Sequence, residues 1–154
     1  MKKVLFVASS GGHLSEMLKL ESIFKCYEYY LVTESTSVTD ALDSKYNMIY
    51  LKYGPNSNFF KYIYISIYNL IKCFRVINKF RPETIVTTGA QVGGFMCFIG
   101  KLFKCKIIYI ESLAKTKTLS KTGEIVYKFA DKFYVQWESL AKNYEKAEYL
   151  GRLM

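Results

Sequence analysis

The sequence predicts an α/β protein with a Rossmann-like, doubly wound parallel sheet. Three observations support this fold class: short apolar runs alternate with helical patterns, glycine-rich loops follow two of these runs, and the length suits one core. The chain has 154 residues, of which 51% are apolar and 23% charged. Because such a chain can bury one sizeable core, we expect residues 1–154 to form a single domain.

The predicted strands are short and mostly continuous in apolar character, which is typical of strands that helices cover on both faces. They span residues 3–8, 28–33, 47–51, 84–88, 106–110 and 132–135. The first run follows Met1-Lys2-Lys3 and superficially resembles a signal peptide, but it is too short and leads straight into Gly-Gly-His. No segment offers the roughly 18 apolar residues that a membrane-spanning helix needs.

Helical patterns fill the gaps between these strands. After the first strand, apolar residues recur at helix spacing at positions 14, 17, 18, 23 and 24. Later helices are predicted at residues 59–80, 92–103, 123–130 and 138–146. Strands that alternate with helices in this way indicate a parallel sheet with helices on both faces.

Both glycine-rich loops fall at the carboxyl ends of predicted strands, where ligands bind in such sheets. The loops are Ser9-Ser10-Gly11-Gly12-His13 and Gly89-Ala90-Gln91-Val92-Gly93-Gly94. Each opens a helix whose free backbone N–H groups favour an anion. Neither loop matches the complete dinucleotide fingerprint or a Walker loop. The pattern by itself indicates an anion or polar-ligand site, and a tight turn is the alternative.

His13 is the only histidine of the chain and directly follows two glycines. Glycines let the backbone approach a ligand, so the next side chain projects into the space that they leave. The start of a helix disfavours a charged imidazole and leaves a neutral nitrogen that can accept a proton. We therefore predict a general base, with a capping or surface role as the alternative.

The charge and the cysteines limit the classes of function. The 22 Lys and Arg residues against 13 Asp and Glu give a net charge of +9, which favours anionic partners. Nucleic acid is one such partner, but no RNP, KH or helix-turn-helix pattern is present, so we expect no nucleic-acid binding.

The four cysteines lie far apart without a Cys-x-x-Cys pair. We therefore expect no metal site, no disulfides and a reduced, cytoplasmic protein.

Several motifs together resemble a known family, and the resemblance covers nearly the whole chain. They are Ser-Ser-Gly-Gly-His-Leu at 9–14, Arg-Pro-Glu-Thr-Ile-Val-Thr-Thr-Gly-Ala at 81–90, Ile-Glu-Ser at 110–112, Leu-Ser-Lys-Thr-Gly at 119–123, Ala-Asp-Lys-Phe-Tyr-Val-Gln-Trp at 130–137 and Tyr-Leu-Gly-Arg-Leu at 149–153. The chain resembles the acceptor-side, membrane-associated subunit of two-component N-acetylglucosaminyltransferases. Its Ser-Ser-Gly-Gly-His form is similar to that of the bacterial branch, which acts in capsular and exopolysaccharide assembly. It also looks like the N-terminal half of the single-chain transferase that makes lipid II.

The resemblance implies one half of a GT-B glycosyltransferase that is divided between two chains. This chain would be the N-terminal, acceptor-facing half, and a separate small subunit would hold the UDP-sugar, so we expect no cofactor bound by this chain. The implied reaction is attack of an acceptor hydroxyl, on a glycan linked to lipid pyrophosphate, at the anomeric carbon of the UDP-sugar with inversion. We expect the chain to be inactive alone and to lie at the cytoplasmic face of the membrane. A free-standing Rossmann-type nucleotide or small-molecule enzyme is the alternative, although a complete nucleotide fingerprint is missing.

The resemblance also assigns roles to residues. His13 is the first candidate for the base, and Glu111, after the fifth strand, is the second candidate for proton transfer or for binding a sugar hydroxyl. For Glu111, pairing with Lys115 or Lys117 is the alternative. Many relatives have glycine in place of Ser9, a difference that bears on how closely the backbone approaches a ligand there. The residues expected to shape the loops around the acceptor pyrophosphate are Ser9, Ser10, Gly11, Gly12, Gly89, Gly93 and Gly94.

The helix at residues 58–80 is the predicted membrane contact. Its apolar residues Ile63, Ile67, Leu70, Phe74 and Ile77 occupy the face opposite a basic stripe. Basic residues attract an anionic leaflet, so we expect peripheral contact with the membrane. The alternative is a long helix that packs its apolar face on the sheet. The candidate contact residues are Lys61, Tyr62, Tyr64, Tyr68, Lys72, Arg75 and Lys79.

Residues 137–154 mix aromatic, aliphatic and basic side chains. The resemblance implies that this segment docks the partner subunit, and packing on the same domain is the alternative. The interface candidates are Trp137, Tyr149, Leu150, Arg152 and Leu153.

Overall fold

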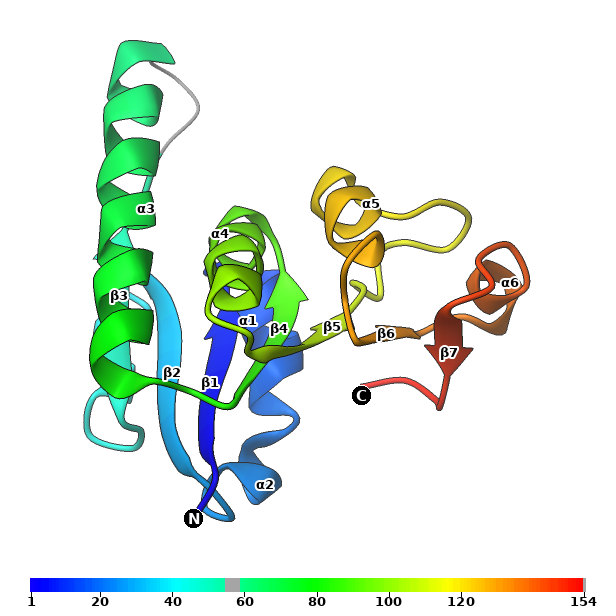
Figure 1. Cartoon of the computed structure of the whole chain (residues 1–154), viewed down its shortest axis with the longest axis horizontal. Coiled ribbons are helices and arrows are strands. Elements are labelled where there is room, and N and C mark those ends of the chain that lie inside the picture. Colours follow the sequence, from blue (N-terminus) through cyan, green and yellow to red (C-terminus); the bar gives the residue numbers. More distant parts are fainter. Residues whose placement is uncertain (55–58, 154) are drawn as a thin grey trace.

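A computed structural model describes residues 1–54 and 59–153, and in it the chain forms one seven-stranded sheet in which every pair is parallel (Figure 1). The strand order is β3-β2-β1-β4-β5-β6-β7. The strands are β1 (Lys3–Ala8), β2 (Glu28–Ser35), β3 (Met48–Lys52), β4 (Thr84–Gly89), β5 (Lys106–Ile110), β6 (Lys132–Val135) and β7 (Ala147–Tyr149). Asn58, where the predicted membrane helix starts, and Met154, where the predicted docking segment ends, lie outside the described residues.

The helices connect these strands in the order that the sequence predicts. Those of the described residues are α1 (Gly12–Leu18), α2 (Glu21–Phe24), α3 (Phe59–Phe80), α4 (Gln91–Leu102), α5 (Lys121–Tyr127) and α6 (Glu138–Ala141), with the short 3-10 helix η1 (Asp40–Leu42) after β2. All six predicted strands are present, and the doubly wound parallel sheet is confirmed.

Three differences from the predictions have local reasons. The helical region after β1 divides into α1 and α2, because the chain makes a turn in which the Leu20 amide donates to the Met17 carbonyl. Helix α5 starts earlier than predicted, because the Ser120 hydroxyl accepts from the amide of Gly123 and caps the first turn.

The third difference is β7, which the sequence does not reveal. This strand has three residues and pairs with β6, so its pattern is too short to recognise without its neighbour. The helix predicted at 138–146 is wrong beyond Ala141, because the chain then turns back to bring residue 147 alongside β6. The Ala147 amide closes this turn by donating to the Tyr144 carbonyl.

The two faces of the sheet carry separate cores. On one face, Leu5, Val7, Ile85 and Ile107 pack beneath α3, α4 and α5. On the other face, residues of β1 such as Phe6 pack against α1 and α2. Figure 1 shows these helices on either side of the sheet. The alternation of inward and outward residues along each strand is what lets one strand serve both cores.

Candidate functional site

The site begins where β1 and β4 lie side by side at the centre of the sheet. The strand order reverses direction here, and loops that leave such a switch point on opposite sides form a crevice for ligands. The loop after β1 and the loop after β4 are bonded to each other: the Ser9 amide donates to the Gly89 carbonyl at 2.8 Å, and the Ala90 amide donates to the Ser9 hydroxyl at 3.1 Å. Ser9 therefore joins the two glycine-rich loops.

Gly11 and Gly12 are the exposed part of the first loop. Gly11 has φ of 88°, a conformation that L side chains rarely adopt, and a Cβ at either glycine would meet no atom within 4 Å. The preceding Ser10 is turned away from this space, because its amide and hydroxyl both donate to Glu34 Oε2, at 3.0 and 3.1 Å. The two glycines thus leave open room beside the start of α1.

His13 is held between the two loops. Its Nδ1 lies 2.7 Å from the carbonyl oxygen of Thr88, and the Thr88 hydroxyl donates to the His13 carbonyl at 2.7 Å. Because a carbonyl oxygen only accepts, the proton must be on Nδ1, so the neutral ring presents an unprotonated Nε2. The ring also packs on Gly89, where a Cβ would come within 3.3 Å of His13 Cε1. This arrangement makes His13 available as a proton acceptor.

The second loop uses its last two glycines for packing. A Cβ on Gly93 would approach the Thr87 hydroxyl to 2.2 Å, and one on Gly94 would approach Thr122 Cγ2 to 2.9 Å. These glycines therefore bring α4 close to β4 and α5. The first turn of α4 has no side-chain cap, which leaves its amide groups for another acceptor.

Glu111 lies after β5 and is fully buried. Its Oε1 accepts from the Ser112 amide at 2.9 Å, and its Oε2 accepts from the Ser120 amide at 2.9 Å and the Ser120 hydroxyl at 3.1 Å. Neither predicted lysine partner takes part in these bonds. The carboxylate orders the start of α5, and its burial leaves no open path to a substrate hydroxyl, so its role in proton transfer stays a prediction.

Two residues that the sequence analysis missed complete the site. Glu16 of α1 accepts from the Ser112 hydroxyl at 2.9 Å and the Leu113 amide at 3.2 Å, and from the side chain of Gln136 at 2.8 Å. Glu16 and Gln136 are 120 positions apart in the sequence, so no local pattern relates them. Only the fold brings α1 and the end of β6 together.

Helix α3 exposes the apolar face that the sequence pattern places opposite the basic stripe. Its contact with the rest of the protein uses Ile65, Asn69, Cys73, Ile77 and Phe80. The alternative prediction, that this apolar face packs on the sheet, is therefore wrong except at Ile77. The exposed apolar side chains of this helix are Phe59, Phe60, Ile63, Tyr64, Ile67, Leu70, Ile71 and Phe74.

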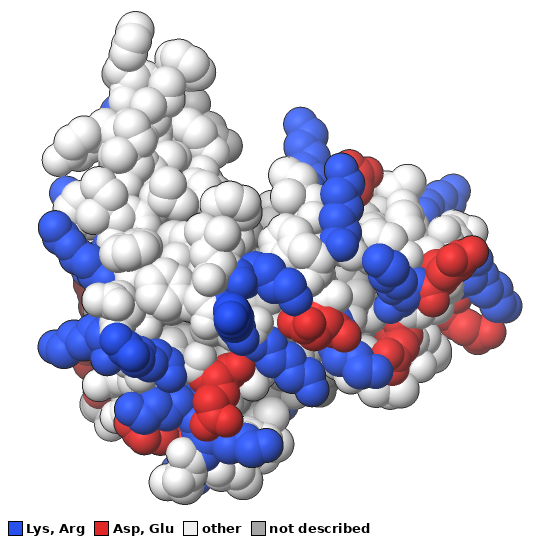
Figure 2. Space-filling model, viewed as in Figure 1, with Lys and Arg blue, Asp and Glu red and all other residues white. Residues whose placement is uncertain are grey.

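The exposed apolar surface continues from α3 onto α4. The Phe74 ring packs edge-on against Phe103, with the centroids 5.4 Å apart, and Phe98 and Leu102 are exposed nearby on α4. Figure 2 shows this face as an area without charged side chains over α3 and α4, with basic residues along its edge. Among residues 1–54 and 59–153, no helix combines the length and apolar character that crossing a membrane requires.

The predicted membrane-contact tyrosines divide between two environments. The Tyr62 hydroxyl accepts from the Gln91 side chain of α4 at 2.6 Å, so this tyrosine faces the second glycine loop. Tyr68 and Tyr64 lie against the ammonium group of Lys52, with Nζ 4.0 and 5.6 Å from their ring centroids. Tyr62 therefore lies towards α4, whereas Tyr64 and Tyr68 lie towards Lys52 at the end of β3.

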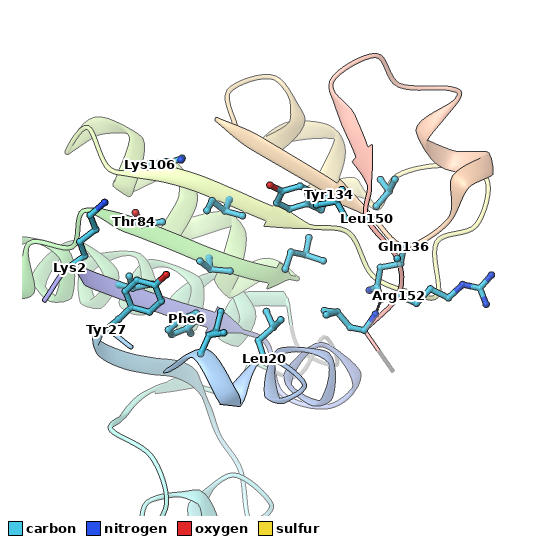
Figure 3. Close-up of a pocket in the computed structure, with 18 residues that line it drawn as sticks. Lys2, Phe6, Leu20, Tyr27, Thr84, Lys106, Tyr134, Gln136, Leu150 and Arg152 are labelled. Atoms are coloured by element: carbon cyan, nitrogen blue, oxygen red, sulfur yellow. Dashed lines mark hydrogen bonds between the residues drawn. The ribbon is translucent and has the colours of Figure 1, made fainter. Parts of the chain in front are cut away.

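A cavity of about 510 Å³ lies on the sheet face that carries α1 and α2, beyond the part which these helices cover. Its walls come from β1, β4, β5 and β6 and from residues 150–153 (Figure 3). Phe6, Val86, Ile108 and Ile110 form its apolar floor, and Gln136 and Arg152 lie at the end next to the C-terminal segment.

The C-terminal segment is fixed on this face by polar contacts. Trp137 donates its indole N–H to the Leu113 carbonyl at 2.7 Å, and the Arg152 guanidinium stacks on the Trp137 ring at 3.8 Å from the centroid. Leu153 packs against the core beside α1, whereas Leu150 remains 77% exposed. Of the apolar and aromatic residues predicted for the interface, Leu150 is thus the most exposed.

In the part of the chain that the structure describes, no group of three or more His, Cys, Asp or Glu side chains is placed to hold a metal ion.

Tyr109 is a buried tyrosine beside Glu111. Burial, and to a smaller extent the charge of Glu111, raise the pKa of Tyr109, so its hydroxyl is neutral. Its hydroxyl lies 3.3 Å from that of Ser120.

Solved structures with the same fold define the class of protein. MurG from Acinetobacter baumannii matches with a TM-score of 0.73 and 13% identity, over 90% of this chain and 43% of MurG. UDP-N-acetylglucosamine 2-epimerase from Rickettsia bellii matches with a TM-score of 0.74 and 15% identity, over 100% of this chain and 46% of the epimerase. The chain spans less than half of either structure, and at these identities the likeness concerns the fold alone. That fold is the Rossmann-like N-terminal half of GT-B enzymes, as predicted.

The particular family follows from sequence. Residues 4–153 match the family described as "Oligosaccharide biosynthesis protein Alg14 like", and the chain belongs to this family. UDP-N-acetylglucosamine transferase subunit alg14 of Schizosaccharomyces pombe is 31% identical, over 97% of this chain and 82% of the relative. The human subunit ALG14 is 25% identical, over 98% of this chain and 82% of the relative. The predicted family is confirmed, and the bacterial capsular branch stays a prediction.

Proposed function

We propose that this chain is the acceptor-binding subunit of a UDP-sugar-dependent glycosyltransferase and that a separate subunit holds the donor. The observation that carries the proposal is the pairing of His13 with Thr88, which leaves Nε2 as a base next to the open space at Gly11 and Gly12. The names of the relatives make UDP-N-acetylglucosamine the first donor to test. Their names also describe these relatives as subunits.

The proposed reaction uses the neutral imidazole. The acceptor hydroxyl gives its proton to His13 Nε2 as its oxygen attacks the anomeric carbon, and the bond from that carbon to the UDP oxygen breaks with inversion. The uncapped amides at the start of α4 would bind the acceptor pyrophosphate. Gly89 lets its loop pack closely on Tyr109 and on the His13 ring. Ser9 and Ser10 act indirectly, because their hydroxyls hold the loops to each other and to Glu34.

Peripheral binding to a membrane fits the surface of α3. Exposed Phe60, Ile67 and Phe74 provide apolar area, and Lys72, Arg75 and Lys79 border it with positive charge. We infer that this face lies on the cytoplasmic leaflet and brings the glycine loops to a lipid-linked acceptor.

We further propose that the chain acts in capsular or exopolysaccharide assembly, in which acceptors are also linked to lipid. The Ser-Ser-Gly-Gly-His form of the first loop supports this proposal.

A partner subunit would complete the site from the C-terminal side. Leu150 is exposed beside a cavity whose floor is the apolar surface of β1, β4 and β5. We infer that the donor-binding subunit docks on residues 137–154, with Leu150 as a central contact.

Recovery of the tagged chain from membranes of its native host tests the proposal. We expect a small partner protein to co-purify in equal amount, and transfer from a UDP-sugar to lipid extract to need both chains. His13→Ala should remove the transfer without removing the partner. Recovery of the chain alone from the soluble fraction, with binding of a nucleotide by the isolated chain, would instead favour a free-standing Rossmann-type enzyme.

A further inference from the structure

The side chain of Gln136, at the end of β6, connects three segments of the chain. It is 2% exposed, and both ends of its amide are bonded. Its Oε1 accepts from the Leu153 amide at 2.8 Å, and its Nε2 donates to Glu16 Oε2 at 2.8 Å and to the Glu111 carbonyl at 3.0 Å. The donor and acceptor ends cannot exchange places, because Leu153 supplies a donor whereas Glu16 and Glu111 supply acceptors.

Glu16 continues this connection to the base. It lies in α1, the same seven-residue helix that contains His13. The other oxygen of its carboxylate accepts from Ser112 and Leu113, so one side chain attaches α1 both to the loop after β5 and to Gln136. A short helix held in this way moves as a unit, and His13 lies three residues before Glu16.

The opposite end of the connection is the proposed docking segment. Residues 150–153 pass over the rim of the cavity, and Figure 3 shows Gln136 beside Arg152 where this segment crosses. If the segment moved, Gln136 Oε1 would lose the Leu153 amide as its donor, and water would take the place of that amide. The contact that holds Oε1 towards residue 153 would then be gone, so the amide could reorient and its bond to Glu16 would change with it.

We propose that Gln136 is a positioning residue that couples the seating of residues 150–153 to the position of α1 and of His13. In the context of the proposed function, on which this consequence rests, docking of the donor subunit would fix the base in place. The chain alone would hold His13 less firmly, which gives a physical reason for a subunit that is inactive without its partner.

The only histidine of the chain provides a direct test. In the full-length chain labelled with ¹³C and ¹⁵N in histidine, the imidazole signals in an NMR spectrum report on His13 alone. Leu153→Pro removes the amide that donates to Gln136, and Leu153→Ala is its matched control because it keeps that amide. We expect Leu153→Pro to shift or broaden the His13 signals well beyond the effect of Leu153→Ala.

The coupling also predicts that the two ends depend on each other. Gln136→Glu keeps the acceptor for Leu153 but turns a carboxylate oxygen towards Glu16, so it should shift the His13 signals by itself. Adding Leu153→Pro to Gln136→Glu should then give little further change. Equal shifts from Leu153→Pro with and without Gln136→Glu, or no shift from Leu153→Pro, would overturn the proposal.

A rescue variant keeps the test valid if Gln136→Glu disturbs the fold. Adding Glu16→Gln to Gln136→Glu exchanges the donor and acceptor between the two positions, and it should return the His13 signals towards those of the wild type. Failure of this exchange in a folded double variant would count against the coupling. These spectra need no partner, donor or acceptor, so their outcome is independent of whether the chain is a transferase subunit.

The assembled enzyme gives a second readout. With the partner bound, Gln136→Glu should lower kcat about 10- to 100-fold, because small displacements of a catalytic group have effects of this size. Partner binding and KM for the UDP-sugar should stay close to the wild type. Loss of partner binding in parallel with kcat would show that Gln136 only supports the interface.

Discussion

Nδ1 of His13 lies 2.7 Å from the carbonyl oxygen of Thr88, and the Thr88 hydroxyl donates to the carbonyl oxygen of His13 at the same distance. This reciprocal pair joins the start of α1 to the end of β4. It sets both the direction of the imidazole ring and the nitrogen that carries the proton. The side chain is thereby prepared to accept a proton at Nε2 before any substrate binds.

His13→Ala should lower transfer by the assembled enzyme about 10²- to 10⁴-fold, the usual contribution of a general base. Thr88→Val, which removes the hydroxyl but keeps the shape, should have a smaller effect because the Thr88 carbonyl still orients the ring. Ser15→Ala is the control, since the Ser15 hydroxyl lies on the same helix and donates to the Gly11 carbonyl four residues earlier. Steady-state kinetics with saturating donor measure all three, and His13→Ala with wild-type kcat would exclude the base assignment.

Ile67→Glu and Phe74→Glu should each weaken binding to lipid vesicles at least tenfold. Both side chains are about half exposed on the apolar face of α3, and removing one from an apolar contact costs about 1.5–3 kcal/mol. Val38→Glu changes an exposed apolar residue elsewhere and should bind as the wild type does. Sedimentation with vesicles of phosphatidylcholine and phosphatidylglycerol measures the binding, and unchanged sedimentation of both α3 variants would rule out this face.

The contribution of the basic residues at the edge of the apolar face can be measured separately from that of the apolar residues. Lys72→Gln and Lys79→Gln should each weaken binding about fivefold on vesicles that contain phosphatidylglycerol, which corresponds to about 1 kcal/mol for a basic residue near an anionic surface. The same variants should bind pure phosphatidylcholine as the wild type does. An equal loss on both kinds of vesicle would indicate a change in folding rather than in charge.

Glu111→Gln should lower the free energy of unfolding by about 2–3 kcal/mol. Both carboxylate oxygens accept backbone amides, so the amide nitrogen of glutamine would face a donor in either orientation. Glu124→Gln, on the exposed side of α5, should change stability little. Urea denaturation compares the two variants. Wild-type stability of Glu111→Gln together with lost transfer would restore the predicted role in proton transfer.

The four cysteines should differ sharply in reactivity at pH 8. Cys26 is exposed, whereas Cys73, Cys97 and Cys105 are buried. Burial raises the pKa of the Cys73 thiol to about 12 and also raises that of Cys97, so neither forms the reactive thiolate at this pH. A thiol reagent should label one site in the folded chain and none in Cys26→Ser, and should reach the remaining cysteines only in denaturant. Rapid labelling of a second site in the folded chain would contradict this core.

Leu150→Asp should weaken association with the donor-binding partner at least tenfold. A charge at a central contact of an interface opposes its desolvation, and residues of this kind often contribute about 2 kcal/mol or more. Val38→Asp is the matched control, because Val38 is a similarly exposed apolar residue that follows β2, on the opposite side of the sheet from β7. Co-purification from detergent-solubilised membranes compares them, and equal recovery of the partner with both would place the interface elsewhere.

The sequence predicts the sheet better than the site. Continuous apolar runs such as residues 3–8 identify the central strands, because only a parallel sheet covered on both faces needs them. The glycine pairs and His13 also stand out, since a turn with open space needs glycine. By contrast, β7 is too short to show a period, and the sequence pattern of α3 does not reveal which of its apolar residues pack on the protein.

The sequence by itself determined the fold class, the family and the position of His13 directly after two glycines, at the start of a helix. Tertiary structure decided what the side chains do, because their partners come from distant segments. Glu111 is the clearest case: its position suggests a catalytic carboxylate, and folding surrounds it with the amides of Ser112 and Ser120. Gln136 is the converse, since it joins Leu153 to Glu16 only when β6, α1 and the C-terminal segment meet. Hydrogen bonds depend on distance and direction in space, and spacing along the chain determines these only within a helix or a turn.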